Sequence, residues 1–226
     1  MKYRPHSLFT LTLLASLTLV SAPSLAQTAL VAETGTASGQ TLNLQLPVYP
    51  SGAQNYFTGA QNITVDGTSF LAFCIDPFQY SSGSPSQYNV SSSLTSLLSA
   101  TQAADVSRLY SQSYASTTGN ALNSAAFQLA LWELANDNGD LSSGSVRATN
   151  LSNGAVTAAG SMINNARNGV AGSTQYTFNL YTNPARQDFL VTVSAVPEPE
   201  SYAMLLAGLG LMGAVVRRRK PSCATL

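Results

Sequence analysis

The stretch NITVDGTSFLAFCIDPFQY, residues 62–80, indicates how this chain folds. Two runs of β-prone residues, NITV and TSFLAFCI, are joined by Asp66-Gly67, and such a dipeptide between such runs is the clearest short signal of a β-hairpin. The hairpin would place Cys74 near the end of its second strand. Residues 76–89 are rich in Pro, Gly and Ser and are predicted to form a loop.

The rest of the chain alternates between strand and helix patterns. Residues 42–48, LNLQLPV, alternate as a half-buried strand does, and residues 174–181 and 187–194 also have strand character. Between them, residues 91–115, 123–137 and about 146–168 carry apolar side chains at helical spacing. We therefore expect a single α+β domain, with a mostly antiparallel, barrel-like sheet closed by its last strand and a helical middle.

The charge of the chain excludes several classes of protein. Residues 27–200 contain four arginines and ten carboxylates, for a net charge of −6, and no lysine or histidine. A nucleic-acid partner is improbable for such a surface. A Ser-His-Asp triad and a His-based metal site lack a necessary residue. NDNGD, residues 136–140, lacks the spacing of a calcium loop and is predicted to be a polar turn. We expect no metal, no cofactor and no enzyme activity.

The N-terminus is typical of an exported protein. Lys2 and Arg4 precede a short apolar run, residues 8–20, and Ser24-Leu25-Ala26 supplies the small residues of a cleavage site. Residues 1–26 are predicted to be a signal peptide, helical in its apolar part, and the mature chain to begin at Gln27.

The C-terminus has three parts in a fixed order. VPEPES, residues 196–201, precedes the apolar segment 202–216, and the cations RRRK follow at 217–220. Fifteen apolar residues fall slightly below the usual spanning length, and the cations would keep the far end in the cytoplasm. Physical reasoning alone leaves two interpretations open, a plain membrane anchor and a processing signal.

This tail resembles the PEP-CTERM sorting signal of Gram-negative bacteria. The resemblance covers about 25 residues and is carried by Val196, Pro197, Glu198 and Pro199, by glycines in the apolar segment, and by the cluster Arg217, Arg218 and Arg219. It implies that an exosortase recognises the Pro-Glu-Pro stretch of this 196–220 signal and removes the tail. The helix at 202–216 would then hold the chain in the inner membrane only transiently, before release to the cell surface or an exopolysaccharide matrix.

Cys74 is the one cysteine expected in the mature chain, because Cys223 lies in the tail. An exported cysteine without a partner is a buried apolar residue, a site for an intermolecular link, or a chemically modified side chain. The residues alone do not decide among these.

Two motifs resemble the thioester domains of Gram-positive surface adhesins, over about residues 40–195. Phe73-Cys74-Ile75-Asp76 is similar to their aromatic-Cys-hydrophobic-acid motif. Residues 126–132, AFQLALW, are similar to their Thr-Gln-x-Ala-Ile/Val-Trp motif, with Phe127 in place of threonine. The resemblance implies that the cysteine sulfur is joined to a glutamine carbonyl carbon with loss of ammonia. Such a bond is an acyl donor for an amine or hydroxyl on a target surface.

The same resemblance implies roles for particular residues of the domain 27–195. The thioester would join Cys74 to Gln187, which begins the last predicted strand, although Asp188 follows where the family has a hydrophobic residue; Gln175 is the second choice. Asp76, Gln128 and Trp132 would support and shield the bond.

A function from another class stays open beside the thioester. The chain would then be a non-covalent structural or polysaccharide-binding component of the biofilm matrix. Its candidate sugar-binding residues are tyrosines, although packing in the core is the preferred explanation for them: Tyr80, Tyr88, Tyr110 and Tyr114.

Overall fold

Seven strands form one antiparallel sheet. The computed structural model describes residues 27–48, 52–169, 172–196, 206–209 and 211–212, so the predicted signal peptide and most of the predicted tail lie outside the described residues. The sheet order is β2-β3-β7-β6-β4-β1-β5. The strands are β1 (Gln27–Gln45), β2 (Gln54–Val65), β3 (Thr68–Cys74), β4 (Ser86–Ser91), β5 (Arg147–Ala148), β6 (Gln175–Asn183) and β7 (Arg186–Val196).

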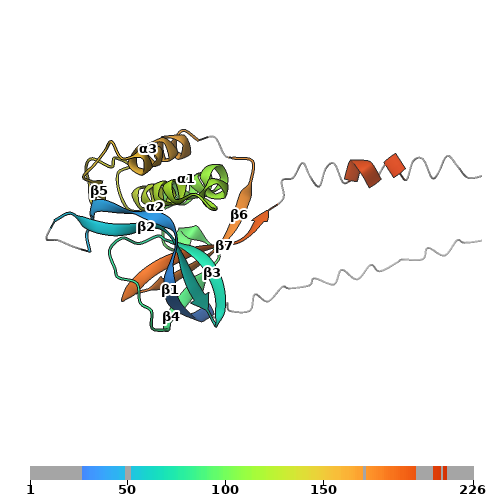
Figure 1. The fold of residues 1–226 in the computed structure, drawn as a ribbon. Coiled ribbons are helices and arrows are strands. Elements are labelled where there is room, and N and C mark those ends of the chain that lie inside the picture. The colour runs from blue at the N-terminus through green and yellow to red at the C-terminus, as the bar shows by residue number, and fades with distance from the viewer. Residues whose placement is uncertain (1–26, 49–51, 170–171, 197–205, 210, 213–226) are drawn as a thin grey trace, which may run out of the picture.

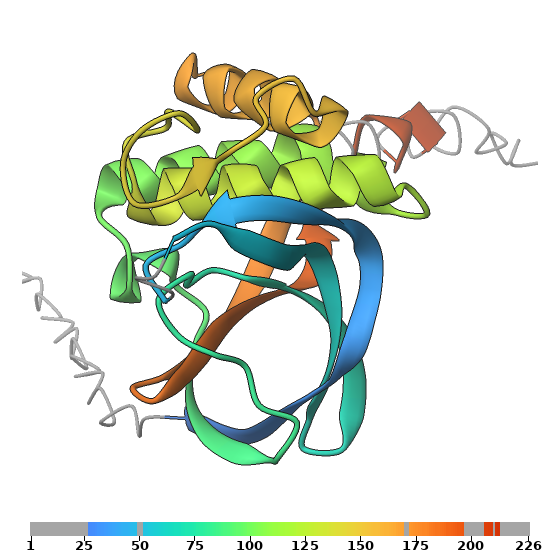
Figure 2. The ribbon, with the colours of Figure 1, turned by 60° about the vertical axis from the view of Figure 1, so that its left-hand side comes forward.

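The sheet closes into a ring because β1 pairs with both β4 and β2. Its first residues, from Gln27 to Val31, pair with β4, and from Val31 to Leu44 it pairs with β2. Figure 2 shows the strands curving around this ring below the helices. The ring brings β3 and β7, which are more than a hundred residues apart in the sequence, side by side.

The predicted hairpin is confirmed. β2 and β3 pair up to Val65 and Thr68, and the two residues between them have positive φ angles, 49° at Asp66 and 81° at Gly67. Positive φ at both central residues is the type I′ geometry that suits the twist of a hairpin. β3 ends in three consecutive buried residues, Ala72, Phe73 and Cys74, because both its faces are covered there.

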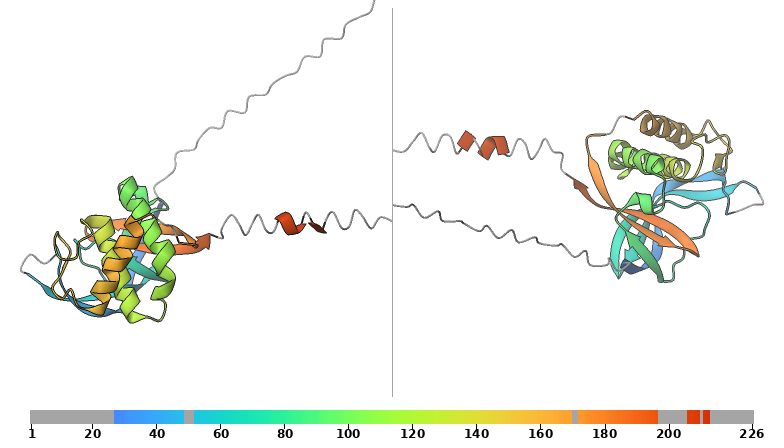
Figure 3. Two further views of the ribbon diagram at one scale, coloured as in Figure 1. Left: turned by 90° about the horizontal axis from the view of Figure 1, so that it is seen from above. Right: turned by 180° about the vertical axis from the view of Figure 1, so that it is seen from behind.

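Three α-helices lie together on one side of the ring (Figures 1 and 3). They are α1 (Ala100–Ser113), α2 (Ala121–Asn136) and α3 (Gly154–Arg167), and two short 3₁₀ helices, η1 (Leu94–Ser96) and η2 (Tyr114–Thr117), flank α1. α2 contacts α1, α3 and strands β1, β2 and β3. Its residues 124–135 are all buried, as expected of a helix that is apolar on every side.

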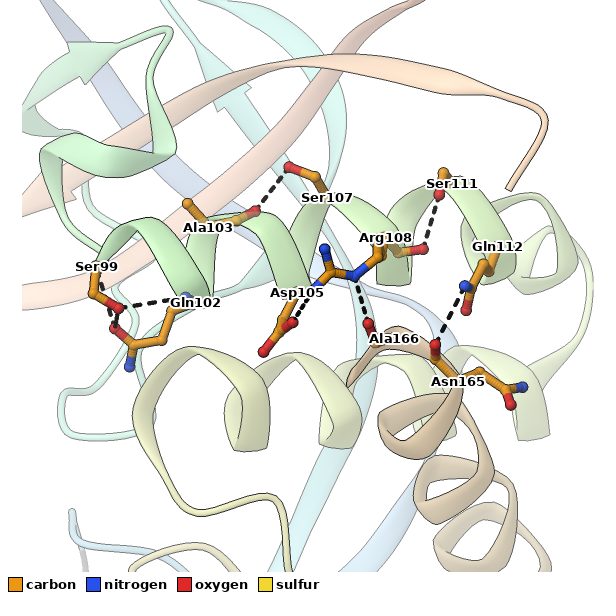
Figure 4. Close-up of polar contacts among 10 residues, drawn as sticks. All are labelled: Ser99, Gln102, Ala103, Asp105, Ser107, Arg108, Ser111, Gln112, Asn165 and Ala166. Carbon is orange, nitrogen blue, oxygen red and sulfur yellow. Dashed lines mark hydrogen bonds and ion pairs between the residues drawn. The ribbon is translucent and has the colours of Figure 1, made fainter. Parts of the chain in front are cut away.

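Polar contacts fix the position of α1. Ser99 and Gln102 form a capping box, in which each side chain accepts a hydrogen bond from the other's backbone N–H. Figure 4 shows Arg108 pairing with Asp105 on its own helix and donating from Nε to the Ala166 carbonyl of α3. The guanidinium therefore joins α1 to the last turn of α3.

The predicted fold class is confirmed, and the element boundaries differ in four places. The strand predicted at 42–48 is the end of the much longer β1, the loop predicted at 76–89 contains the start of β4, and α1 and α3 begin about eight residues later than predicted. Of the predicted segment 202–216, residues 206–209 and 211–212 are described, and they are helical. Within the described part of the chain, no helix is both long and apolar enough to cross a membrane.

Candidate functional site

Cys74 lies at the point where β3 leaves the sheet. It pairs with Phe189 of β7, and its side chain is completely buried. Burial raises the pKa of the thiol well above its usual value, and the negative charges of Glu33 and Asp76 raise it further. Cys74 is therefore a protonated, neutral thiol shielded from water.

The pairing of β3 with β7 continues one residue beyond Cys74. The Ile75 N–H donates to the Asp188 carbonyl over 3.0 Å, so the register brings residue 76 opposite residue 187. Side chains two residues apart on a strand lie on the same face. Cys74 and Gln187 thus lie on one face as diagonal neighbours, a spacing that long side chains can bridge.

Three hydrogen bonds and burial hold Gln187 in place. Its side-chain Nε2 donates to the Asp76 carbonyl over 3.2 Å, and its backbone N–H donates to the Tyr80 carbonyl over 3.0 Å. Its own carbonyl accepts a hydrogen bond of 3.1 Å from the Tyr88 hydroxyl. The residue is only 8% exposed. The amide is therefore fixed beside the chain segment that follows Cys74.

Helix α2 supplies the opposite wall of the site. Gln128, Trp132 and Asn136 are spaced by four residues and therefore lie along one stripe of the helix. Gln128 makes two hydrogen bonds with the backbone of Cys74, and the Asn136 Nδ2 donates to the Ile75 carbonyl over 2.6 Å. The stripe therefore fixes the backbone N–H and carbonyl of Cys74 and the carbonyl of Ile75.

Two buried carboxyl groups lie close to Cys74 and Gln187 in the sequence. Asp76 accepts a hydrogen bond from the Phe78 N–H, and burial raises its pKa. Burial also raises the pKa of Asp188 to about 7. The hydrogen bond that its Oδ1 accepts from the Asn183 N–H opposes this rise. Asp188 lies next to Gln187 along β7, so its side chain is on the opposite face, where it fixes the β6–β7 turn.

A cavity of ≈ 230 Å³ adjoins Gln187. Trp132 lines it from α2, and the segment after Asp76 lines it through Pro77, Gln79 and Tyr80. Trp132 is 4% exposed. Gln187 lines this cavity, whereas Cys74 does not.

The structure brings five of the predicted domain residues together. Cys74, Asp76, Gln128 and Gln187 are linked by the contacts described above, and Trp132 shares the cavity with Gln187. Gln175, the second choice, is exposed and pairs with Val196 at the other end of the β6–β7 ladder.

Sequence reasoning missed Asn136 and the role of Tyr88 beside Gln187. Tyr88 was considered only as a candidate sugar-binding residue, because it lies on a strand that was predicted as loop. Asn136 is eight residues after Gln128, and this helical spacing was a usable signal. Of the four candidate sugar-binding tyrosines, Tyr88 and Tyr110 are buried and Tyr114 packs against the core, whereas Tyr80 is 52% exposed.

Phe127, which stands where the adhesin motif has threonine, is a packing residue. Its ring lies 4.6 Å from that of Phe73 and 4.8 Å from that of Tyr110, measured between centroids, and it is completely buried. It packs against the strand that carries Cys74, and it does not line the cavity beside Gln187.

Comparison with known proteins gives two results. Residues 195–220 match the PEP-CTERM protein-sorting motif. The sorting residues predicted from the sequence, at 196–199 and 217–219, lie within this match, and all except Val196 lie outside the described residues. The motif implies an exported protein that an exosortase processes and that reaches the cell surface or the extracellular space. No curated protein matches the chain.

Two solved structures resemble the domain. One is the N-terminal thioester domain of a surface protein from Clostridium perfringens, with a TM-score of 0.45 and 18% identity, covering 75% of this chain and 100% of that one. The other is the N-terminal domain of the Streptococcus pyogenes pilus tip adhesin Cpa, with a TM-score of 0.42 and 12% identity, covering 72% of this chain and 98% of that one.

Proposed function

We propose that this exported domain attaches covalently to a target through an internal thioester between Cys74 and Gln187. The observation that carries the proposal is the register of β3 and β7, which puts the two side chains on one face as diagonal neighbours. The Asp76 carbonyl supports it further, because it holds the amide nitrogen that must leave.

Formation of the bond needs no cofactor. The Cys74 sulfur attacks the Gln187 side-chain carbonyl carbon, a C–S bond forms, and the C–N bond breaks. The amide nitrogen leaves as ammonia and takes the thiol proton. When a target amine or hydroxyl attacks the same carbon, the C–S bond breaks, an amide or ester forms, and the proton ends on the sulfur. Because the thiolate is a far better leaving group than an amide nitrogen, the thioester is the reactive state.

The surroundings suit a bond that must survive export. Cys74 is inaccessible to solvent and the Gln187 side chain is nearly so. A buried thioester is protected from water until a ligand reaches it. The chain acts once and does not turn over, so it is an adhesive protein of the cell surface or biofilm matrix and not an enzyme.

Intact mass of the full chain, purified from the producing cells, tests this function. We expect a species that is one ammonia lighter than the same chain with a free thiol and a free amide. Methylamine should add to this species, and the reaction should free a thiol that can be alkylated. Cys74→Ala and Gln187→Ala should each abolish the mass loss, whereas Gln175→Ala, at the far end of the same hairpin, should leave it unchanged.

An unmodified mass together with an alkylatable thiol at Cys74 on the unfolded chain would reject the thioester. The remaining candidate would then be a non-covalent component of the extracellular matrix. Co-sedimentation with purified exopolysaccharide that does not change in Cys74→Ala would support that candidate.

A further inference from the structure

The chain contains three Asn-Gly dipeptides, and none of them is part of the site around Cys74. They are Asn138-Gly139, Asn153-Gly154 and Asn168-Gly169. In such a dipeptide the backbone nitrogen of the glycine can attack the side-chain carbonyl carbon of the asparagine, because glycine has no Cβ atom to hinder the approach. A cyclic imide, the succinimide, forms and ammonia leaves.

The reaction requires the peptide group between the two residues to turn toward the asparagine side chain. Hydrogen bonds that hold the asparagine side chain, its backbone carbonyl or the glycine N–H oppose this turn. Each ordinary hydrogen bond should slow the reaction about two- to tenfold. The structure therefore distinguishes the three dipeptides by the bonds that hold them.

The first dipeptide is held on every side. The Asn138 Oδ1 accepts a hydrogen bond of 2.7 Å from the Asp140 N–H, and the Asn138 backbone carbonyl accepts one of 2.6 Å from Arg167 Nη1. The Gly139 N–H donates to the buried Glu133 Oε2 over 2.9 Å. The side chain, the carbonyl and the attacking nitrogen are all fixed.

The second dipeptide is held by the helix that it begins. Asn153 is the N-cap of α3, and its Oδ1 accepts a hydrogen bond of 2.9 Å from the Ala155 N–H. Its backbone carbonyl accepts the Thr157 N–H, also over 2.9 Å. Turning this peptide group would open the first turn of α3.

The third dipeptide follows the last residue of α3, and both of its residues are exposed. The Asn168 N–H donates to the Asn164 carbonyl over 2.9 Å. The Asn168 side chain, the Asn168 carbonyl and the Gly169 N–H make no hydrogen bond to a described residue. Gly169 has a φ of 87°, which glycine adopts without a steric cost. This peptide group can turn without breaking a hydrogen bond of its own.

We propose that Asn168 is a site of spontaneous modification, where the exported chain loses a side-chain amide and gains a negative charge. The Gly169 nitrogen bonds to the Asn168 side-chain carbon, the bond from that carbon to the amide nitrogen breaks, and the proton of the Gly169 nitrogen ends on the departing ammonia. Water then adds to either imide carbonyl, one C–N bond breaks, and aspartate or isoaspartate results at position 168.

The new carboxylate would lie at the C-terminal end of α3. The last carbonyls of a helix make an anion unfavourable there. Isoaspartate would also add a methylene to the main chain between α3 and β6. Asn168 lines a polar hollow together with Ser113, Asn165 and Ser173, and no charged residue is in its described lining. The modification would make this hollow anionic.

Tryptic peptide mapping of the full chain tests the proposal. Trypsin cuts after arginine, and the arginines at 108, 147, 167 and 186 place the three dipeptides in separate peptides, 109–147, 148–167 and 168–186. The purified chain is incubated at mildly alkaline pH, and mass spectrometry follows the fraction of each peptide that has become an acid. A sample digested without incubation gives the background.

We expect peptide 168–186 to convert about tenfold faster than the other two, the effect of two ordinary hydrogen bonds. In concentrated urea, where these bonds are lost, the three peptides should convert at similar rates. Asn168→Gln is the matched variant, because its longer side chain would have to close a larger ring. It should abolish conversion of 168–186 and leave the other two peptides unchanged.

Two outcomes would overturn the proposal: conversion of 168–186 no faster than that of both other peptides in the folded chain, and a difference among the three that persists in urea. None of these peptides contains Cys74 or Gln187, so the result is independent of the thioester. The succinimide also lacks one ammonia, but this mass loss would remain in Cys74→Ala and would free no thiol with methylamine.

Discussion

The side-chain amide of Gln128 pairs with both backbone groups of Cys74. The Cys74 N–H donates to Oε1 over 3.0 Å, and Nε2 donates to the Cys74 carbonyl over 2.6 Å. The pairing of β3 with β2 ends at Ala72, so Cys74 has a strand neighbour only on the β7 side. One glutamine of α2 therefore replaces the missing strand and fixes the backbone that carries the sulfur.

Replacing Gln128 should destabilise the domain. Gln128→Leu leaves a buried N–H and a buried carbonyl without partners, and each such group costs about 1–3 kcal/mol. We expect the free energy of unfolding to fall by about 2–4 kcal/mol in urea titrations, whereas Gln87→Leu at the surface should change it by less than about 0.5 kcal/mol. A surface-like effect of Gln128→Leu would show that these two hydrogen bonds are dispensable.

Closure of the ring depends on a close approach of β1 and β2. Gly39 and Gly59 face each other in the ladder, where β1 is irregular. A Cβ atom on Gly39 would lie 2.4 Å from the Thr58 carbonyl oxygen, and one on Gly59 would lie 2.3 Å from the Ser38 carbonyl oxygen. Both obstacles are backbone atoms, so no side-chain rotation can relieve the contact.

Gly39→Ala should therefore cost about 2–4 kcal/mol of folding free energy, at the upper end of single substitutions. The matched change is Gly160→Ala in α3, where the added Cβ meets no atom within 4 Å. Because alanine favours a helix over glycine, this variant should be more stable by about 0.5–1 kcal/mol. Thermal unfolding of the two variants under one set of conditions should shift in opposite directions.

Local signals in the sequence predict the parts of this fold that are formed locally. The hairpin at Asp66-Gly67 needs only two adjacent strands and a turn, and α2 is apolar enough to be recognised by itself. β4 follows a Ser- and Pro-rich segment, and it becomes a strand because β1 and β6 offer hydrogen bonds on both of its sides. The first half of β1 was also not predicted as a strand, because its irregular register breaks the alternation of buried residues.

The candidate site also has a part that local sequence predicts and a part that depends on long-range contacts. The motifs at Cys74 and Gln128 are short and contiguous, and Gln187 was chosen because the resemblance places the partner glutamine in the C-terminal part, where Gln187 begins the last predicted strand. The cavity was not predictable, because Glu33, Gln61 and Gln79 come from three separate segments that meet only when the ring closes. No spacing along the chain records that meeting.

Processing of the tail should depend on the Pro-Glu-Pro stretch. The PEP-CTERM match at 195–220 implies that an exosortase reads this segment. Replacing Pro197, Glu198 and Pro199 by alanine should leave most of the chain uncleaved in the membrane fraction, whereas alanine at Gln175 in the domain should not affect processing. Immunoblots of membrane and extracellular fractions measure this. Normal release of the triple variant would show that the stretch is not the recognised element.

Glu133 makes the stability of the domain depend on pH. The side chain is completely buried, and its Oε2 accepts a hydrogen bond of 2.9 Å from the Gly139 N–H. Burial, followed by the negative charge of Asp137, raises its pKa to about 7 from an ordinary value of 4.5. A carboxyl group that binds its proton more tightly in the folded state stabilises the fold below its unfolded pKa, and this contribution is lost as the pH rises through its folded pKa.

Stability should therefore fall between about pH 4.5 and pH 7 through Glu133, and Asp188, with a pKa of about 7, should act in the same direction. Glu133→Gln keeps an acceptor for Gly139 and should be more stable than the unmodified chain at pH 8, by about 1–2 kcal/mol after solvent screening, with the difference shrinking toward pH 5. Asp140→Asn tests the sign. The pKa of exposed Asp140 is lowered by hydrogen bonds from Ser142, so this variant should be less stable at neutral pH and should approach the unmodified chain in acid. Urea titrations across this pH range measure both variants, and parallel profiles for Glu133→Gln and the unmodified chain would show that Glu133 titrates normally.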